Sequence, residues 1–406
     1  MARLVQKYGG TSVGDIDRIR NVARRVKAAV DDGYQVAVVV SAMAGVTDRL
    51  VGWVNETAPL HDAREYDAVV ATGEQVTSGL LALALQDIGV SARSWHGWQL
   101  PLRTDGTHGA ARILSIDTEE IERRLEAGQV AVVTGYQGLS PEGRITTLGR
   151  GGSDTSAVAL AAALGAERCD ICTDVEGIYT ADPRIVSAAH KLDLITYEEM
   201  LEMASQGTKV LQTRAVALAM RYRVRLQVLS SFTQSPGTLV VDEDEIVEEQ
   251  MVSGIAYSRD EAKITLVGVQ DKPGVAASIF GPLADANVNV DMIVQNVSAD
   301  GSLTDLTFTV TTADLARTVA LLEDEGRDFD YKSLKSDASV VKVSVIGVGM
   351  RSHAGVATKM FQTLADKGIN IQVISTSEIK ISILIAEDYL ELALRALHSA
   401  YGLDAE

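Results

Sequence analysis

The first roughly 240 residues alternate between short apolar runs and longer segments in which every third or fourth residue is apolar. Runs such as QVAVVVSA and QVAVVTGY are apolar without interruption, which is typical of parallel strands covered on both faces. Segments 16–31 and 119–126 have helical periodicity. The pattern predicts an α/β fold with a mainly parallel sheet in an αβα sandwich. Its expected strands are 4–8, 35–41, 130–136, 168–173 and 225–229.

A different pattern begins near Asp242, where the acidic run DEDEIVEEQ is typical of a linker or a solvated edge. Beyond it, GVAASIFGPLADANVNVDMI from Gly274 matches GVATKMFQTLADKGINIQVI from Gly355. Strand-like segments flank each copy, so the repeat predicts two βαββαβ modules of ferredoxin-like type. A pair of modules that only holds two chains together would have the same pattern.

These patterns divide the 406 residues into four parts. We expect the sandwich at 1–245, a linker and edge strand at 246–263, and the modules at 264–337 and 338–406. Apolar residues make up 46% of the chain, which is enough for the cores of two or three domains.

Charge and composition narrow the possible partners. The formal net charge of −18 argues against nucleic acid or an anionic membrane as the main partner. We find no apolar run long enough to span a bilayer and no signal peptide. Two cysteines in a chain of this length indicate a reducing compartment, so we expect a cytoplasmic protein. Cys169 and Cys172 are three apart on a predicted strand and should face opposite sides, which excludes a shared metal or a disulfide.

The stretch LVQKYGGTSV places Lys7 near the end of a predicted strand and just before Gly9 and Gly10. Open α/β sheets bind ligands at the carboxyl ends of their strands, and glycines leave backbone N–H groups open to an anion. This combination indicates a phosphate site. A tight turn beside a half-exposed lysine explains the segment equally well, because the full P-loop pattern is absent.

Four further turns at predicted strand ends carry candidate chemistry: SAMAGVTD, ATGEQVTSG, TLGRGGSDTSAVALAAAL and GTKVLQTRA. The glycine-rich third turn feeds a helix directly, so its N–H groups and Arg150 form an anion site. Lys209, in the fourth, is expected in the first turn of a helix, where a bound anion would offset the unfavourable dipole. Each turn alone is compatible with an ordinary strand–helix connection. Together they favour one site for phosphates and a carboxylate-bearing substrate.

The combination of KYGGTS, SAM, TGE, GRGGSD and TDVEG resembles the aspartokinase family, and the resemblance covers the whole chain. It implies an amino-acid kinase domain followed by two ACT domains, without a fused homoserine dehydrogenase. The implied reaction transfers the γ-phosphoryl group of ATP to the β-carboxylate of L-aspartate, giving 4-phospho-L-aspartate for lysine, diaminopimelate, threonine and methionine biosynthesis. A carboxylate with a pKa near ~4 is already nucleophilic at neutral pH, so no general base is required. Catalysis would rest on positioning and charge neutralisation.

The resemblance also implies roles for individual residues. Lys7 would stabilise the transferring group and Asp154 would orient Lys7. Mg²⁺ would enter with ATP, held mainly by phosphate oxygens and water. The implied nucleotide set is Lys7, Tyr8, Gly9, Gly10, Ser41, Thr173, Asp174, Tyr179, Asp182, Arg184 and Lys209. The implied substrate set is Ser41, Thr47, Glu74, Arg150, Gly151, Gly152 and Ser153, with Arg150 and Ser153 on the α-carboxylate and Glu74 facing the ammonium group.

The ACT resemblance implies feedback by lysine, threonine or both. The implied effector residues are Asp271, Gly274, Asn289, Val290, Asp291, Gln295, Val356, Ala357, Asn370, Ile371, Ser377 and Glu378. Turn capping and solvated loops explain any one of them equally well. The resemblance further implies a homodimer or a larger assembly through the ACT domains. A shorter regulatory chain that starts at Met251 is a further expectation.

Two other functions remain open at this stage. The first is another amino-acid kinase of the same fold, acting on glutamate, acetylglutamate or carbamate. The second is a non-catalytic amino-acid sensor built on the repeat. The intact set of Lys7, Arg150 and Asp154 argues against a sensor without activity.

Overall fold

The computed structural model describes the chain except residues 101, 208–209, 247–250, 298–300, 325–328, 354 and 405–406. The described residues form two compact units. The N-terminal unit contains Met1–Ile178, Lys191–Ser205 and the described part of Lys209–Glu248. The C-terminal unit contains Tyr179–His190 and the described parts of Gln206–Thr208 and Glu249–Glu406.

The N-terminal unit is built on an eight-stranded sheet with the order β10-β12-β11-β9-β1-β2-β6-β3. Within the described residues only β11 and β12 pair antiparallel, so the expected mainly parallel sheet is confirmed. The strands are β1 (Arg3–Tyr8), β2 (Gln35–Val40), β3 (Ala92–Trp95), β6 (Val130–Thr134), β9 (Arg168–Thr173), β10 (Leu194–Thr196), β11 (Leu226–Ser230) and β12 (Thr238–Val241).

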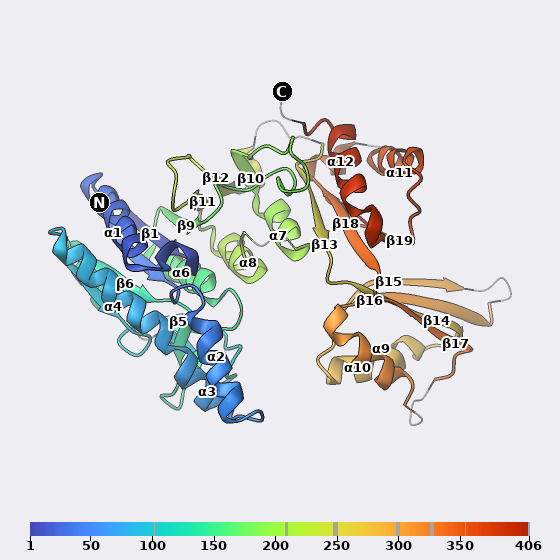
Figure 1. Cartoon of the computed structure of the whole chain (residues 1–406), viewed down its shortest axis with the longest axis horizontal. Helices are drawn as coiled ribbons and strands as arrows, with labels where there is room; N and C mark the ends of the chain where they lie inside the picture. The colour runs from blue at the N-terminus through green and yellow to red at the C-terminus, as the bar shows by residue number, and fades with distance from the viewer. Residues whose placement is uncertain are drawn as a thin grey trace. The chain divides into compact units, whose positions relative to one another are not determined.

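Helices cover both faces of this sheet. Side chains alternate along β2, so Val36, Val38 and Val40 join the core beneath α1 and α4. The two helices lie side by side (Figure 1). The helices of this unit are α1 (Ile16–Asp31), α2 (Val46–Thr57), α3 (Ala63–Val70), α4 (Thr72–Asp87), α5 (Glu119–Glu126), α6 (Gly152–Leu164), α7 (Tyr197–Ser205) and α8 (Thr213–Tyr222).

A second, smaller sheet has the order β5-β4-β7-β8. Its strands are β4 (Leu102–Thr104), β5 (Ile113–Ile116), β7 (Gln137–Leu139) and β8 (Ile145–Thr147). The sequence predicted one strand over 130–136, but β6 ends at Thr134 because the chain turns at Tyr136, which has a φ of 69°. This turn leads into β7 and separates the two sheets.

One helical stretch corrects a sequence expectation. Ala63–Asp87, which joins α3 and α4, is 25 residues long and apolar enough to cross a membrane by length and composition alone. The expectation that no run has this property is therefore wrong. Half of its most apolar window is buried, and Leu81 and Leu85 lie in the core with α1. This is how a core helix of a folded domain is placed, and it is weak support for a membrane span.

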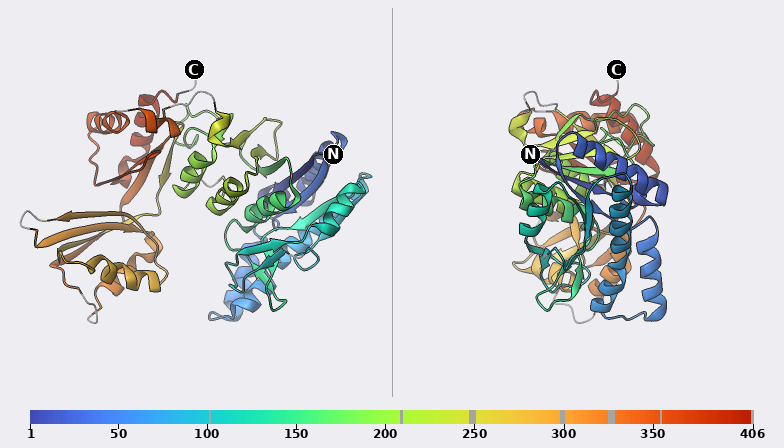
Figure 2. Two further views of the ribbon diagram at one scale, coloured as in Figure 1. Left: turned by 180° about the vertical axis from the view of Figure 1, so that it is seen from behind. Right: turned by 90° about the vertical axis from the view of Figure 1, so that its left-hand side faces the viewer.

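The C-terminal unit contains two modules, each with its helices on one face of a four-stranded sheet (Figure 2). The first sheet has the order β15-β16-β14-β17. Its elements are β14 (Ala262–Gln270), α9 (Val275–Asp285), β15 (Val290–Val297), β16 (Leu303–Val310), α10 (Leu315–Leu322) and β17 (Ser333–Asp337). This is the expected βαββαβ order, contiguous in sequence.

The second module obtains its fourth strand from elsewhere in the chain. Its own segments are β18 (Val340–Ile346), α11 (Val356–Asp366), β19 (Val373–Thr376), β20 (Lys380–Ala386) and α12 (Leu390–Ala400). The sheet has the order β13-β18-β20-β19, and β13 (Gly254–Ser258) precedes the first module in sequence. Residues 254–258 therefore run antiparallel to β18 and complete the sheet that the repeat began.

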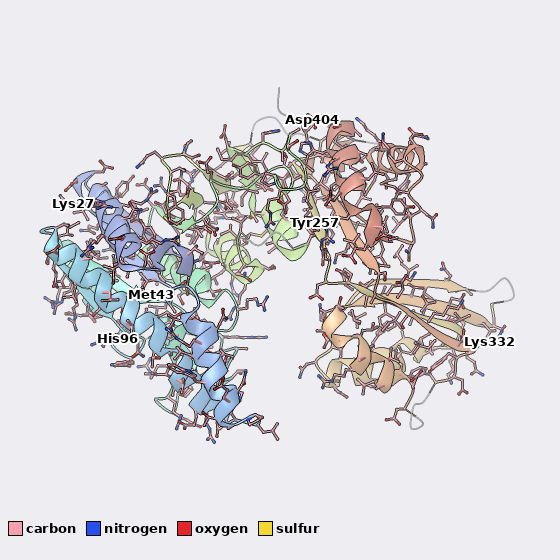
Figure 3. The ribbon with its side chains drawn as sticks, viewed as in Figure 1. Lys27, Met43, His96, Tyr257, Lys332 and Asp404 are labelled. Atoms are coloured by element: carbon pink, nitrogen blue, oxygen red, sulfur yellow. The ribbon has the colours of Figure 1, made fainter. Side chains whose placement is uncertain are left out.

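The segment Tyr179–His190 also belongs to the C-terminal unit, although it lies between β9 and β10 in sequence. Ala181 and Val186 are buried in the core of the second module with Ile255 and Leu397. Thr180 Oγ1 lies 2.8 Å from Nε2 of the fully buried His398, and Asp404 Oδ1 lies 2.8 Å from Nδ1 of the same ring. Figure 3 labels Tyr257 on β13 and Asp404 after α12.

Two smaller expectations can now be placed. Within the acidic run, Glu243–Glu245 form a short 3-10 helix, and 247–250 lie outside the described residues. Cys169 and Cys172 both lie on β9 as free, buried thiols, and burial raises the pKa of each. Neither thiol is placed for reactivity, because a thiolate is disfavoured in an apolar interior.

Candidate functional site

The carboxyl ends of six parallel strands, β11, β9, β1, β2, β6 and β3, lie at one edge of the large sheet. Adjacent parallel strands are in register there, with Tyr8 opposite Val40 and Cys172. The loops that follow are tied together by backbone bonds from Gly9 N to Cys172 O (3.2 Å) and from Ser41 N to Tyr8 O (3.1 Å). Met43, labelled in Figure 3, marks the loop after β2. Lys7, Ser41 and Thr173 therefore lie at one edge, as the sequence predicted.

Lys7 and Tyr8 point to opposite faces of β1 because side chains alternate along a strand. Lys7 points toward α6, where its Nζ lies 2.6 Å from Asp154 Oδ1. Both side chains are nearly buried, at 12% and 9% exposed, although Oδ1 has no partner with good hydrogen-bond angles. The Tyr8 side chain is fully buried in the core on the other face, and burial raises its pKa. Tyr8 can therefore contact a ligand only through its backbone.

The glycine-rich turn begins α6 as expected. Gly149 and Gly151 have φ values of 76° and 71°, which favour glycine, and α6 starts at Gly152. A Cβ on Gly151 would lie 1.9 Å from Gln212 Cγ, so no larger residue fits there. Ser153 is buried and Arg150 is exposed. The first turn of α6 thus offers backbone N–H groups, and the cation Arg150 directly precedes the Gly151 cap.

Glu74 is buried in the first turn of α4 and lies beside the loop after β2. Its Oε1 accepts a hydrogen bond from Ala42 N at 3.0 Å, whereas Oε2 is buried without a hydrogen-bond partner. Burial raises the pKa of Glu74 to about 7, and the Ala42 bond opposes this. A buried carboxylate oxygen without a partner is costly unless a donor arrives, so Glu74 is suited to bind a cationic group.

Comparison with known proteins decides the family. The amino acid kinase family model matches residues 2–230, and ACT domain models match 263–327 and 343–401. The aspartate kinase of Stutzerimonas stutzeri is 55% identical over 406 residues, covering 100% of this chain and 98% of that protein. The chain belongs to the aspartokinase family.

Solved structures of the aspartokinase family give the same fold. Escherichia coli aspartokinase III in complex with aspartate and ADP (R-state) has a TM-score of 0.79 at 28% identity, covering 98% of this chain and 99% of that one. The same enzyme in complex with lysine and aspartate (T-state) has a TM-score of 0.77 at 28% identity, covering 98% of both chains. The expected amino-acid kinase fold with two C-terminal ACT domains is confirmed.

The remaining residues of the expected aspartokinase site fall into three groups. Thr47 is half-buried on α2, whose N-cap Gly45 has a left-handed conformation. Thr173, at the end of β9, donates from Oγ1 to Asp174 Oδ1 at 3.2 Å. Tyr179, Asp182 and Arg184 lie in the segment that belongs to the C-terminal unit. There Tyr257 Oη donates to Asp182 Oδ2 at 3.0 Å, and Arg184 forms an ion pair with the same carboxylate at 2.7 Å. Lys209 lies outside the described residues.

The expected effector residues lie at equivalent places in the two ACT modules. Gly274 and Gly355 precede α9 and α11 with φ values of 93° and 97°, and each leaves its helix without a side-chain cap. The first group is Asp271, Gly274, Asn289, Val290, Asp291 and Gln295. The second group is Val356, Ala357, Asn370, Ile371, Ser377 and Glu378.

Two of the acidic effector positions, Asp291 and Glu378, already have a charged partner from the chain itself. Arg351 Nε lies 3.6 Å from Glu378 Oε2. Lys342 Nζ on β18 lies 2.7 Å from Asp291 Oδ2 and 2.7 Å from Glu261 Oε1. Burial of Asp291 alone would raise the pKa of its carboxyl, but the Lys342 ammonium outweighs this and lowers it. Nothing in the sequence indicates the Lys342–Asp291 pairing, because Lys342 is 51 residues away from Asp291.

Sequence reasoning missed a polar cluster beside the glycine-rich turn. Asp67 on α3 is fully buried, and its carboxylate accepts bonds from the Thr147 hydroxyl and Gly109 N. Arg214 on α8 donates to the carbonyls of Leu148 and Ala111 at 2.9 and 2.8 Å. The available signal was Asp67 among the residues of YDAVV, which does not identify a partner.

One surface hollow is unrelated to this chemistry. It has a volume of about 480 Å³ and is lined by Arg3, Gln35 and Gly165, at the amino ends of the strands. Ligand sites of open α/β sheets lie at the opposite edge. We therefore place the candidate site at the carboxyl edge.

Proposed function

We propose that this kinase transfers the γ-phosphoryl group of ATP to the β-carboxylate of L-aspartate, giving 4-phospho-L-aspartate. The observation that carries the proposal is the nearly buried Lys7–Asp154 pair at the carboxyl edge, next to a glycine-rich turn. Phosphoryl transfer needs a preorganised positive charge where negative charge develops. Asp154 holds the Lys7 ammonium at that place. We assign the glycine pair to the phosphate as well: Gly10 would supply a backbone N–H group, and Gly9, whose N–H donates to Cys172 O, would leave room for the close approach.

The acceptor side is assigned by charge. Arg150 and Ser153 would bind the α-carboxylate of aspartate. Gly151 and Gly152 would line the same place as part of the turn, in which Gly152 N donates to Gly149 O at 3.0 Å. The open oxygen of Glu74 would take the ammonium group, which repairs its missing partner. Ser41 and Thr47 would contact the reacting carboxylate. Binding both ends of the amino acid turns the reaction into a positioned, effectively unimolecular step.

The nucleotide side rests on the family resemblance and on E. coli aspartokinase III, which was solved with ADP. We assign to it Thr173, Asp174, Tyr179, Asp182, Arg184 and Lys209, with Lys7, Gly9, Gly10 and the backbone of Tyr8. Mg²⁺ would neutralise phosphate charge. Among the described residues no group of three or more His, Cys, Asp or Glu side chains is placed to hold a metal.

Feedback control is assigned to the ACT modules. The same E. coli enzyme was solved with lysine, and among the described residues neither α9 nor α11 has a side-chain cap at its N-terminus. We assign lysine, threonine or both as effectors at the two groups of loop residues. A bound lysine would compete with Lys342 for Asp291, because both ligands present an ammonium group.

The product belongs to lysine, threonine and methionine biosynthesis in the cytoplasm. We propose the domain limits 1–245, 246–263, 264–337 and 338–406. We also propose that the ACT modules hold the chains in a dimer or larger assembly, and that a shorter regulatory chain starts at Met251. Exposed apolar residues on the edge strands β15 and β19, such as Val297 and Ile374, support association.

The deciding experiment traps the acyl phosphate with hydroxylamine in the presence of ATP and Mg²⁺. L-aspartate, glutamate, acetylglutamate and carbamate are compared as acceptors. We expect hydroxamate only with aspartate. Hydroxamate only with another acid, or no ATP turnover with any of them, contradicts the proposal.

A further inference from the structure

A buried polar cluster lies beside the turn at 149–153, and we name it the Asp67 cluster: Asp67, His108, Gly109 and Thr147. The Asp67 carboxylate lies 2.5 Å from Thr147 Oγ1 and 2.7 Å from His108 Nδ1. Gly109 N donates to both of its oxygens at 3.1 Å. Asp67 has no exposed surface. A buried carboxylate is costly unless donors surround it, and here three groups do so.

The cluster joins three separate segments of the N-terminal unit. Asp67 is in the middle of α3, His108 and Gly109 are in the loop between β4 and β5, and Thr147 ends β8. Fully satisfied buried networks of this kind fix one arrangement, because every alternative leaves a polar group without a partner. The three segments are therefore fixed relative to one another.

These segments support the glycine-rich turn directly. Thr147 precedes Gly149 by two residues, and Thr147 O accepts a bond from Ala111 N at 2.9 Å. A Cβ on Gly149 would lie 3.2 Å from Gly109 O, so the turn rests closely on the loop that Asp67 holds. On the other side, Arg214 holds the Leu148 carbonyl at 2.9 Å. The residues that lead into Arg150 are thus fastened from two sides.

The next helix carries Glu74. Helices α3 and α4 follow one another with only Ala71 between them, and Asp67 and Glu74 lie seven residues apart, one on each helix. Ala71 N donates to Asp67 O at 3.1 Å, so the turn of α3 that carries Asp67 is hydrogen-bonded to the residue that precedes α4. The carboxylate that faces the ammonium group and the carboxylate that anchors the turn bearing Arg150 are therefore on consecutive helices joined by a single residue.

We propose that Asp67 is a positioning residue that determines specificity for the acceptor. It sets the separation between Glu74 and the Arg150 turn, and so the positions of the ammonium and α-carboxylate groups relative to the reacting β-carboxylate, which is the third contact that distinguishes an L- from a D-α-amino acid. It touches neither substrate. This inference rests on the proposed roles of Glu74 and Arg150.

The test is Asp67→Asn, which keeps the size of the side chain but turns an acceptor oxygen into a donor that faces other donors. We expect the KM for aspartate to rise about 10- to 100-fold, because small displacements of binding groups have effects of this size. The KM for ATP should stay within about twofold. The ratio of kcat/KM for L-aspartate over D-aspartate should fall by at least about tenfold.

Glu199→Gln is the matched control. Glu199 is a buried carboxylate on α7 that accepts bonds from Thr196 N and Oγ1, both at 3.1 Å, and neither of these donors belongs to the Asp67 cluster or the turn. This control should change neither KM nor the L/D ratio. Thr147→Val removes a single bond of the cluster and should change the aspartate KM in the same direction by a smaller factor. If Asp67→Asn does not fold, the aspartate KM of Thr147→Val tests the positioning role instead.

The outcomes separate this inference from the proposed function. Folded Asp67→Asn and Thr147→Val variants with unchanged aspartate KM and L/D ratio overturn the positioning role, since a merely structural role changes only the amount of active enzyme or the Tm. If Glu74→Gln and Arg150→Ala leave the aspartate KM unchanged, the site assignment is wrong, and this inference is overturned with it. If those two variants have a raised aspartate KM while Asp67→Asn has an unchanged aspartate KM and L/D ratio, the positioning role of Asp67 is wrong and the proposed function stands.

Discussion

At the scale of single residues, the Lys7–Asp154 pair is the most specific arrangement in the structure. Lys7→Ala removes a cation that Asp154 holds 2.6 Å away. We expect kcat to fall about 100- to 10,000-fold, because a preorganised charge acts mainly in the transition state. The KM for aspartate should change little. Steady-state kinetics checks this, and a near-normal kcat would refute the role of Lys7.

Glu74 predicts a pH dependence. Its pKa is raised to about 7 by burial, so the carboxyl is neutral below that pH and ionised above it. Only the ionised form attracts an ammonium group. We expect kcat/KM for aspartate to rise with pH through about 7.

Glu74→Gln tests the origin of this dependence. The substitution should raise the aspartate KM and remove the rise with pH, since the amide does not titrate in this range. The pH profile is measured at saturating ATP for both proteins. An unchanged profile in the variant would assign the titration to another group.

At the scale of elements, the turn before α6 depends on the conformation of Gly151. Gly151→Ala introduces a Cβ that would lie 1.9 Å from Gln212 Cγ, at a φ of 71°. Gly143 is the matched control, because its φ is 76° and no atom lies within 4 Å of the position that a Cβ would take there. We expect Gly143→Ala to cost only the backbone strain of about 1 kcal/mol.

Gly151→Ala should in addition displace the turn and raise the aspartate KM at least about tenfold. The two variants are compared by thermal unfolding and by aspartate saturation. Equal effects on KM would show that strain, and not the close contact with Gln212, governs this turn.

The elements also show what the sequence could and could not predict. The helix expected at 16–31 coincides with α1, because its apolar period and its Asp15 cap are local signals. The sequence could place Lys7 and the glycine turns at one edge, because they lie at the carboxyl ends of predicted parallel strands. The Asp67 cluster was not predictable, since its partners come from positions 41 and 80 residues away. The five residues of β13 give no signal that their partner is β18.

At the scale of the whole molecule, control requires that the effector loops influence catalysis without taking part in it. Asp291→Ala removes one of the two carboxylate partners of Lys342, and Glu261 still pairs with this lysine. The substitution also removes one acceptor for an effector. Ser377→Ala changes the equivalent region of the second module. We expect either variant to raise the inhibitory concentration of lysine or threonine about tenfold, with uninhibited kcat almost unchanged. Coupling energies of roughly 1–3 kcal/mol are typical of such systems.

Asp285→Ala is the control for this experiment, because Asp285 is an exposed carboxylate at the far end of α9. It should leave inhibition as it is. Rates of acyl-phosphate formation are measured with each amino acid alone and with both together. If neither amino acid slows the unmodified enzyme, the regulatory role of the ACT modules is wrong.

The borrowed strand of the second module has a consequence for synthesis on the ribosome. The first module is contiguous from Ala262 to Asp337 and has all its strands as soon as that stretch has emerged. β13 emerges earlier, but its partner β18 begins at Val340, about 80 residues after Ser258. At about 5–20 residues per second, β13 waits several seconds for a partner. Translation thus imposes an order on the nascent chain. The first module can complete its sheet first, and the second module completes its sheet later with β13, a strand synthesised before either copy of the repeat.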